Sequence, residues 1–320
     1  MDYLTLHKEL FVVNAHLDSI LSIVNGRLDY TIRNNRGHSD IPRIREGGVD
    51  LLVFAVYVEQ HYKPEGALKR TMELIDAIYQ LVDSSPDLEL VLTAKDVERI
   101  RQEGKIGILL AIEGADGVMN IGCLRNFYRL GVRLITLTWS NSNLLAAGVD
   151  EEKGWGLTNF GRECLEEMND LGIIVDVSHL ALEGFWDVIK LSKAPIVASH
   201  SNARAICNHR RNLTDEQLLA LKENGGVIGL CYAPGHLREG GGADVDDIFK
   251  HLYYIKDLIG IDHVGLGTDF DGIVEAPRGM EDISKTPLIT KRMLEEGFSR
   301  EDIAKVMGEN FLRVIKQVLK

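Results

Sequence analysis

The sequence predicts an α/β fold, a (β/α)8 or TIM barrel, on three observations. Eight short apolar runs recur along the 320-residue chain, helix-like segments separate most of them, and potentially reactive polar residues follow five of the runs. With 45% hydrophobic residues, the chain can build a sizeable core. We therefore expect a single barrel domain that spans residues 1–320.

The eight apolar runs are the expected strands. They are continuously apolar rather than alternating, which is typical of strands buried on both faces of a parallel sheet. In chain order the runs are Phe11–Ala15, Val49–Val58, Ile106–Ile112, Val132–Thr138, Ile173–Val177, Ile196–Ser199, Val227–Cys231 and Val264–Gly267. Two long loops are expected after the first and seventh strands, over Asn25–Gly48 and Pro234–Ala243.

Helix signals lie between the strands. Ala67–Val82 carries apolar residues at helical spacing, and Thr158–Leu171 begins with a capping residue and is followed by a glycine. Thr214 and Ser299 each begin a further capping sequence. A doubly wound open sheet is the alternative architecture, but it requires a glycine fingerprint after the first strand. The chain has Asn14-Ala-His-Leu-Asp18 there instead.

Charge and the N-terminal residues bear on partners and location. The formal net charge of -12 argues against nucleic acid or an anionic membrane as partner, because both require a basic face. The first residues have no basic start followed by an apolar run, and no stretch reaches the ~18 apolar residues of a spanning helix. We expect a cytoplasmic protein without a signal peptide, and a homodimer is one option for its assembly.

Reactive groups of a barrel lie at the carboxyl ends of its strands, and three candidate metal ligands follow the first and third runs. His16 and Asp18 are two residues apart, so both side chains can reach one ion, and nitrogen with carboxylate oxygen suits zinc. Glu113 ends a wholly apolar strand and can bridge two ions. The alternatives are a helix cap or surface pair for His16 and Asp18, and an ion pair with an arginine for Glu113.

Three further candidates follow later strands. His179 and His200 each come after a serine at the end of an apolar run, and with Glu113 they can form a second metal site. Alone, each would more often be a core or capping histidine. Asp269 is the candidate proton carrier, because it lies beside the ligands at a strand end, whereas its rival Asp271 lies further out in the loop.

Arg211 is the candidate clamp for a substrate carboxylate, because a guanidinium binds a carboxylate through two hydrogen bonds. Arg210 is its rival. A surface ion pair is the ordinary role of an arginine and remains the alternative for both.

These residues resemble the membrane dipeptidase, or renal dipeptidase, family of zinc metallopeptidases over about residues 16–284. The membrane-anchored animal members carry secretion and lipid-anchor signals, which we do not find in this sequence, so we expect a soluble bacterial-type member. The matching motifs are Asn14-Ala-His-Leu-Asp18, Ile41-Pro-Arg-Ile-Arg-Glu-Gly-Gly48, Ala111-Ile-Glu-Gly114, Leu130-Gly-Val-Arg-Leu-Ile-Thr-Leu-Thr138, Asp176-Val-Ser-His179, Pro195-Ile-Val-Ala-Ser-His-Ser201, Arg210-Arg-Asn212 and Gly265-Leu-Gly-Thr-Asp-Phe-Asp-Gly272.

The resemblance implies a metal-dependent hydrolase barrel that holds two Zn²⁺ ions per chain and hydrolyses dipeptides, including those with a D residue at the carboxyl side. The implied zinc ligands, with Glu113 shared between the ions, are His16, Asp18, Glu113, His179 and His200. Asp269 matches the acid/base aspartate of the family, and Arg211 matches the arginine that binds the terminal carboxylate of the substrate. We expect a metal-bridging hydroxide to attack the peptide carbonyl.

One motif departs from the family pattern. Known members have Leu-Thr-His after the fourth strand, and that histidine is thought to contact the scissile carbonyl oxygen, whereas this chain has Leu137-Thr-Trp139. Trp139, through its indole N–H, and Asn141 are therefore the expected substrate contacts on this side, with Asn143 and a zinc ion as alternatives.

Two other functions remain open at this point. The first is another binuclear metal hydrolase on the same scaffold, acting on lactones, cyclic amides or phosphoesters. The second is a catalytically weakened binding barrel, which the change at Trp139 suggests and the intact ligand set argues against.

Overall fold

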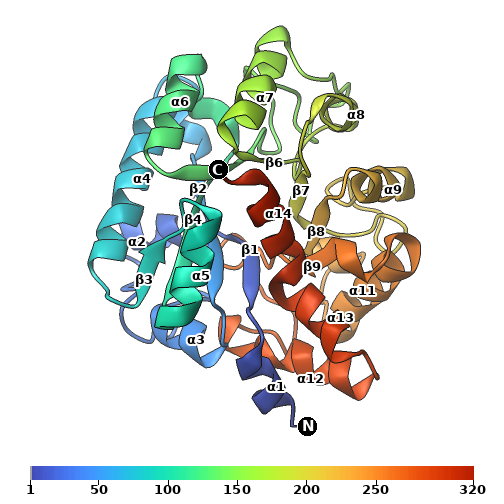
Figure 1. Ribbon diagram of the computed structural model, residues 1–320. Coiled ribbons are helices and arrows are strands. Elements are labelled where there is room, and N and C mark those ends of the chain that lie inside the picture. Colours follow the sequence, from blue (N-terminus) through green and yellow to red (C-terminus); the bar gives the residue numbers. More distant parts are fainter. Residues whose placement is uncertain (1) are drawn as a thin grey trace.

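Eight parallel strands close into a barrel in the computed structural model, which describes residues 2–320 (Figure 1). β1 pairs with β2 on one side and with β9 on the other, and the pairing of β2 with β4 completes the ring. The strands of the ring are β1 (Val13–Leu17), β2 (Leu51–Tyr57), β4 (Ile106–Glu113), β5 (Val132–Thr136), β6 (Ile174–Asp176), β7 (Val197–Ser201), β8 (Val227–Leu230) and β9 (Val264–Leu266). The predicted barrel is confirmed, and the open-sheet alternative is wrong.

The observed strands differ from the predicted runs by at most two residues at either end. Apolar burial continues into the flanking turns, as at Phe11 and Val12, so hydrophobicity alone does not mark where pairing begins. The short strand β3 (Leu88–Leu90) was not predicted, because three residues with a glutamate in the middle form no apolar run. It pairs with the first part of β4, while β5 pairs with the later part.

Helices surround the ring. The α-helices are α1 (Tyr3–Glu9), α2 (Ser19–Val24), α3 (Ile41–Glu46), α4 (Ala67–Asp83), α5 (Ala94–Glu103), α6 (Ile121–Arg129), α7 (Asn159–Leu171), α8 (Leu182–Leu191), α9 (Asp215–Glu223), α10 (Pro234–Leu237), α11 (Val245–Ile259), α12 (Pro287–Glu295), α13 (Arg300–Ala304) and α14 (Asn310–Val318). Short 3-10 helices are η1 (Gln60–Tyr62), η2 (Ala115–Gly117), η3 (Ile261–His263) and η4 (Ile283–Lys285), and η5 (Lys305–Glu309) is a π-helix.

The capping residues that the sequence predicts begin their helices as expected. Thr158 accepts a hydrogen bond from the backbone N–H of Gly161, and Thr214 and Gln217 form a reciprocal capping box. Ser299 begins α13 and accepts a hydrogen bond from the backbone N–H of Asp302. The two predicted loops are partly helical, since the first contains α3 and the second contains α10.

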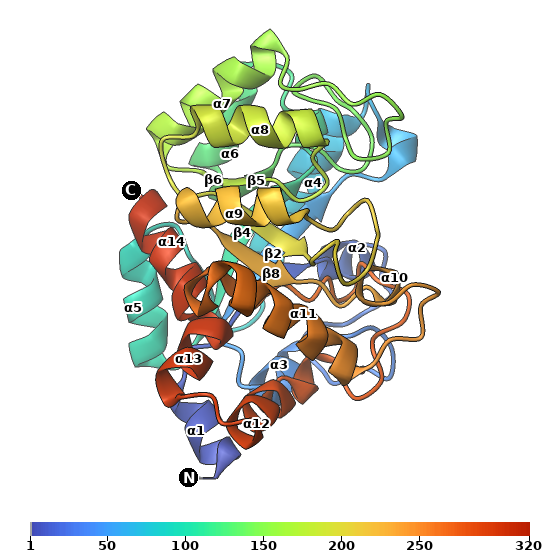
Figure 2. The ribbon, with the colours of Figure 1, turned by 90° about the vertical axis from the view of Figure 1, so that its right-hand side faces the viewer.

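α14 closes one end of the barrel. Its residues Phe311, Val314 and Ile315 join a buried cluster with inward-pointing strand residues such as Val13 and Leu109. Figure 1 shows α14 lying across the middle of the ring, and Figure 2 shows it at the end opposite to the loops around α2 and α10. Only the end that carries the carboxyl ends of the strands is therefore left to form a cavity, which is where barrel enzymes carry their reactive groups.

Within residues 2–320, no helix combines the length and the apolar character needed to cross a membrane. The cytoplasmic location and the homodimer considered from the sequence stay predictions.

Two glycines let β7 approach its neighbours closely. A Cβ atom on Gly267 would lie 1.7 Å from the carbonyl oxygen of Ser199, and one on Gly229 would lie 2.0 Å from the same atom. Since real side-chain atoms do not tolerate such distances from a backbone oxygen, these positions require glycine.

We predict that Gly267→Ala lowers the free energy of unfolding by about 3 kcal/mol or more, because the new methyl group must displace the backbone of β7. Gly235→Ala is the matched control, since a Cβ atom there meets no atom within 4 Å, and it should change stability by no more than about 0.5 kcal/mol. Urea denaturation of both variants measures the difference. Equal stability of the two would contradict this account of strand packing.

Candidate metal centre

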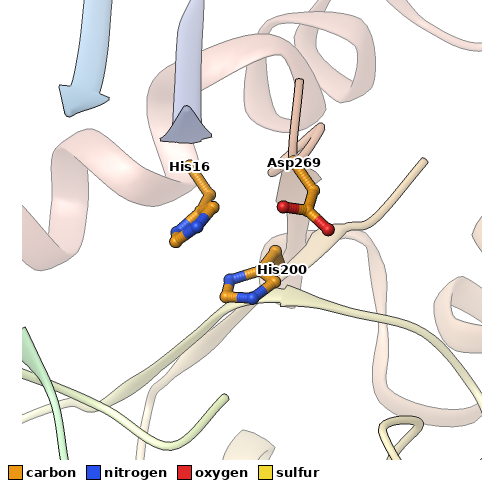
Figure 3. Close-up of side chains that lie close together, drawn as sticks. All are labelled: His16, His200 and Asp269. Atoms are coloured by element: carbon orange, nitrogen blue, oxygen red, sulfur yellow. The ribbon is translucent and has the colours of Figure 1, made fainter. Parts of the chain in front are cut away.

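The barrel fold brings the six candidate side chains from five strands to one place. His16 lies in β1 and Asp18 directly follows it, Glu113 ends β4, and His200 lies in β7. His179 and Asp269 each lie three residues beyond the last residue of β6 and β9. Figure 3 shows that His16, His200 and Asp269 point toward one another from three different segments.

Glu113 is at the centre of the cluster. Its Oε1 atom lies 3.6 Å from Nε2 of His16, 3.0 Å from Nε2 of His179 and 3.4 Å from Nε2 of His200. The two nitrogens of His179 and His200 are themselves 2.9 Å apart. Three imidazole nitrogens therefore converge on one buried carboxylate oxygen.

Local backbone irregularities aim several of these side chains. The β1–β2 register shifts between Asn14 and Leu17, and the β7–β8 register shifts between Ala198 and Ser201, so the strand pairing is irregular where His16 and His200 stand. A β-bulge is one such irregularity that redirects side chains beside functional sites. His179, Asp269 and Asp271 have left-handed backbone conformations, with φ of 67°, 62° and 67°, which residues with side chains adopt uncommonly.

The cluster fits divalent metal ions. Nε2 of His16 is buried and has no hydrogen-bond partner among the described residues, although Oδ2 of Asp18 lies 3.2 Å away. A buried polar atom without a partner is expected where an ion or water completes the site. Ligand atoms also fall within 4.8 Å of one another in the two sets that the sequence predicts, His16 with Asp18 and Glu113, and Glu113 with His179 and His200. Nitrogen and carboxylate oxygen are the ligand atoms that zinc favours.

The pKa shifts reflect strong electrostatic coupling within the cluster. Burial lowers the pKa of His16, but the negative charges of Asp18 and Glu113 outweigh it and raise that pKa to about 10. Burial and the positive charge of Arg211 lower the pKa of His179 to about 4. Burial and repulsion by Asp18 raise the pKa of Asp269 well above its usual value. Buried carboxylates packed this closely require compensating positive charge.

Asp269 and its rival Asp271 have different surroundings. The Asp271 carboxylate accepts hydrogen bonds from the backbone N–H of His38, at 2.5 Å, and from the hydroxyls of Ser39, at 2.8 Å, and Ser19. Asp271 therefore holds the loop after β1 in place. Asp269 instead faces the metal ligands, with a ligand atom within 4.8 Å of those of His16 and His200.

The two arginines also differ. Arg211 is 5% exposed and donates from Nη2 to the backbone oxygen of His200 at 3.1 Å, while its buried Nε has no partner within residues 2–320. Arg210 is exposed and forms an ion pair with Asp150 at 3.3 Å. Of the two, Arg211 has an unused donor beside the cluster.

A cavity of about 500 Å³ opens above the cluster, which is a volume suited to a small ligand. Its wall includes Glu113, Asp269, Arg211 and Trp139, together with Tyr57, which the sequence did not single out. Tyr57 ends β2 in register with Glu113. Its position at the end of an apolar strand was the one sequence signal that could have predicted it as a cavity residue.

Of the two substrate contacts expected after the fourth predicted strand, Trp139 lines the cavity and Asn141 lies on the surface. The Trp139 ring lies 5.1 Å from that of Tyr57 and 5.8 Å from that of His179, between centroids. Asn141 is exposed and is not among the residues that line the cavity. Asn143 holds its own loop, since its amide donates to the backbone oxygen of Leu137 at 2.8 Å.

A family model, a related sequence and solved structures all relate this chain to dipeptidases. The model of the membrane dipeptidases, peptidase family M19, matches residues 2–320. An uncharacterized dipeptidase of Schizosaccharomyces pombe is 38% identical over 299 residues, which are 88% of this chain and 72% of that protein.

Two crystal structures extend the comparison. Dipeptidase AC, a metallopeptidase of family M19, has a TM-score of 0.92 at 30% identity over 97% of this chain and 99% of its own. A metallopeptidase from Rhodobacter sphaeroides, solved with a phosphinate mimic of the dipeptide L-Ala-D-Ala, has a TM-score of 0.90 at 29% identity over the same shares.

We predict that Glu113→Gln loses most of its bound divalent metal, because a neutral amide cannot balance the charge of a bound cation. The loss of affinity should exceed the roughly 10–100-fold that removal of an outer hydrogen-bond partner costs. Elemental analysis after dialysis against a fixed free-zinc concentration measures it. Asp150→Asn, at an exposed carboxylate of the cavity wall, should retain its metal; retention by both variants would argue against a metal at Glu113.

Proposed function

The chain belongs to the membrane dipeptidase family, peptidase family M19, and from this premise we propose that it is a binuclear zinc dipeptidase that cleaves free dipeptides. The observation that carries the proposal is the convergence of three imidazole nitrogens on Oε1 of Glu113, each within 3.6 Å. Shared cations would satisfy the buried carboxylate and the three nitrogens together.

The residues divide into two ligand sets. His16 and Asp18 would hold one zinc ion, His179 and His200 the other, and Glu113 would contribute to both. When bound, two such ions lower the pKa of a water molecule that becomes the nucleophile, and they polarise the peptide carbonyl.

Arg211 would bind the substrate's terminal carboxylate. It is buried in the cavity wall, and its unpartnered Nε beside Nη2 leaves donors for a carboxylate. This clamp requires a free carboxylate next to the reacting bond, and α14 closes the far end of the barrel. Both features favour dipeptides over longer chains. The Rhodobacter sphaeroides relative was solved with a mimic of L-Ala-D-Ala, which supports L-D as well as L-L substrates here.

Asp269 would carry the proton of the reaction. During hydrolysis, water adds to the carbonyl carbon, the C–N bond breaks, and the departing nitrogen must gain a proton. The Asp269 carboxylate faces the ligand cluster, with an oxygen within 4.8 Å of the ligand atoms of His16 and His200, so it could take a proton from the attacking water and hold it. It then returns the proton to the nitrogen. Trp139 and Tyr57 would form the wall beside the amino-terminal residue of the dipeptide.

We predict that Asp269→Asn lowers kcat for L-Ala-D-Ala and L-Ala-L-Ala by about 100-fold or more while bound zinc is retained, because only proton transfer is lost. Steady-state kinetics with parallel metal analysis measures both quantities. Asp271→Asn should reduce thermal stability and have the smaller effect on kcat, since Asp271 holds the loop after β1. The reverse order of effects would exchange the two roles.

We predict that Arg211→Ala lowers kcat/KM for dipeptides by about 30-fold or more, the effect of removing roughly 2 kcal/mol or more of buried charge pairing. The same variant should change little toward dipeptide amides, which lack the carboxylate. Arg210→Ala, which removes an exposed guanidinium, is the matched control. Comparable losses on acids and amides would contradict carboxylate recognition by Arg211.

A further inference from the structure

A fully buried carboxylate lies beneath the candidate metal ligands and has no part in the reaction proposed above. Asp176 ends β6 and is 0% exposed. Its Oδ1 accepts hydrogen bonds from the backbone N–H groups of Ser178, at 3.0 Å, and Ser199, at 2.9 Å. Its Oδ2 accepts from the hydroxyls of Thr136 and Ser199, each at 2.6 Å.

The Ser199 hydroxyl joins this carboxylate to two histidines. Its Oγ lies 2.8 Å from Nδ1 of His200 and 3.5 Å from Nδ1 of His16. Oγ of Ser178 is also 3.4 Å away, but the contact with Asp176 is much shorter. One serine oxygen therefore touches one histidine from each of the two proposed ligand sets.

The directions of these hydrogen bonds follow from the groups themselves. An ionised carboxylate only accepts, and a hydroxyl has one hydrogen to donate. If Ser199 donates its hydrogen to Asp176, then its oxygen must accept from the ring N–H at Nδ1 of His200. That proton assignment leaves Nε2 of His200 free of hydrogen on the side that faces Glu113.

We propose that Asp176 and Ser199 are positioning residues that fix His200, and more weakly His16, in the tautomer able to bind metal through Nε2. This inference rests on the ligand roles proposed above. It extends them to two residues that do not touch the metal or substrate. An outer partner of this kind orients the ring and increases its basicity as a ligand.

His179 is held differently. Its Nδ1 lies 2.9 Å from Oγ of Ser140, which is not among the four donors to Asp176. Thr136 offers the complementary comparison, because it donates to Oδ2 of Asp176 at the same distance as Ser199. Within residues 2–320, the Thr136 hydroxyl forms no hydrogen bond to a histidine. Thr136→Val is therefore the matched control for Ser199→Ala.

The test is a mutant cycle read out as zinc affinity of the full-length protein, by competition with a chromophoric chelator. Ser199→Ala should raise the zinc dissociation constant of the lower-affinity site by about 10-fold. Thr136→Val should change the same dissociation constant by less than threefold. Asp176→Asn should weaken it by about 100-fold. The introduced amide would turn its N–H donors toward Ser199, so that the hydroxyl points to His200 and forces the ring proton onto Nε2.

The double variant Asp176→Asn with Ser199→Ala is decisive. Without the Ser199 hydroxyl, no group forces the ring proton of His200 onto Nε2. The zinc affinity of the double variant should therefore equal that of Ser199→Ala alone. A purely structural role predicts instead that the double variant binds zinc as weakly as Asp176→Asn or more weakly, and that result would overturn the proposal. Far-UV circular dichroism confirms folding of each variant.

Two further outcomes keep the test decisive. If Asp176→Asn does not fold, the pair Ser199→Ala and Thr136→Val decides, and equal zinc affinity in these two overturns the proposal. Failure of the unmutated protein to bind zinc would instead contradict the proposed function, which separates the two ideas.

Discussion

The close approach of several charged groups at the mouth of the barrel is the constraint on which the rest of the structure depends. Asp18, Glu113 and Asp269 lie among three imidazoles at the base of the cavity, and Oε1 of Glu113 lies within 3.6 Å of all three Nε2 atoms. Burial of carboxylates is unfavourable unless cations or hydrogen-bond donors compensate it. The pair of shared cations proposed above would compensate all of these groups at once.

The scaffold meets this constraint by rigid placement. Parallel strands bring residues distant in sequence to one edge, and the pairing of β1 and β7 is irregular at their histidines. Glycines in or after β8 and β9 allow β7 to approach closely. α14 fills the opposite end, so the cavity has one mouth. Below the ligands, Asp176 receives four hydrogen bonds from three neighbouring segments and links the strands to the ring orientation of His200.

Much of this could be predicted from sequence, for physical reasons. Strands buried on both faces are apolar throughout, and residues that follow them in a barrel must share an edge, so His16, Glu113 and His200 could be placed together from spacing alone. The strand β3 could not be predicted, because three residues with a central glutamate form no apolar run. The roles of Asp176 and Ser199 depend on strand register, and the exposure of Asn141 depends on a loop path, neither of which leaves a local signal.

The most direct measurement is a crystal structure of the zinc-loaded protein with anomalous diffraction recorded on both sides of the zinc absorption edge. The account predicts two peaks about 3.5–4 Å apart, one on either side of the Glu113 carboxylate. One set of ligands should come from His16 and Asp18, and the other from His179 and His200. Peaks elsewhere, or none between these side chains, would contradict the central claim.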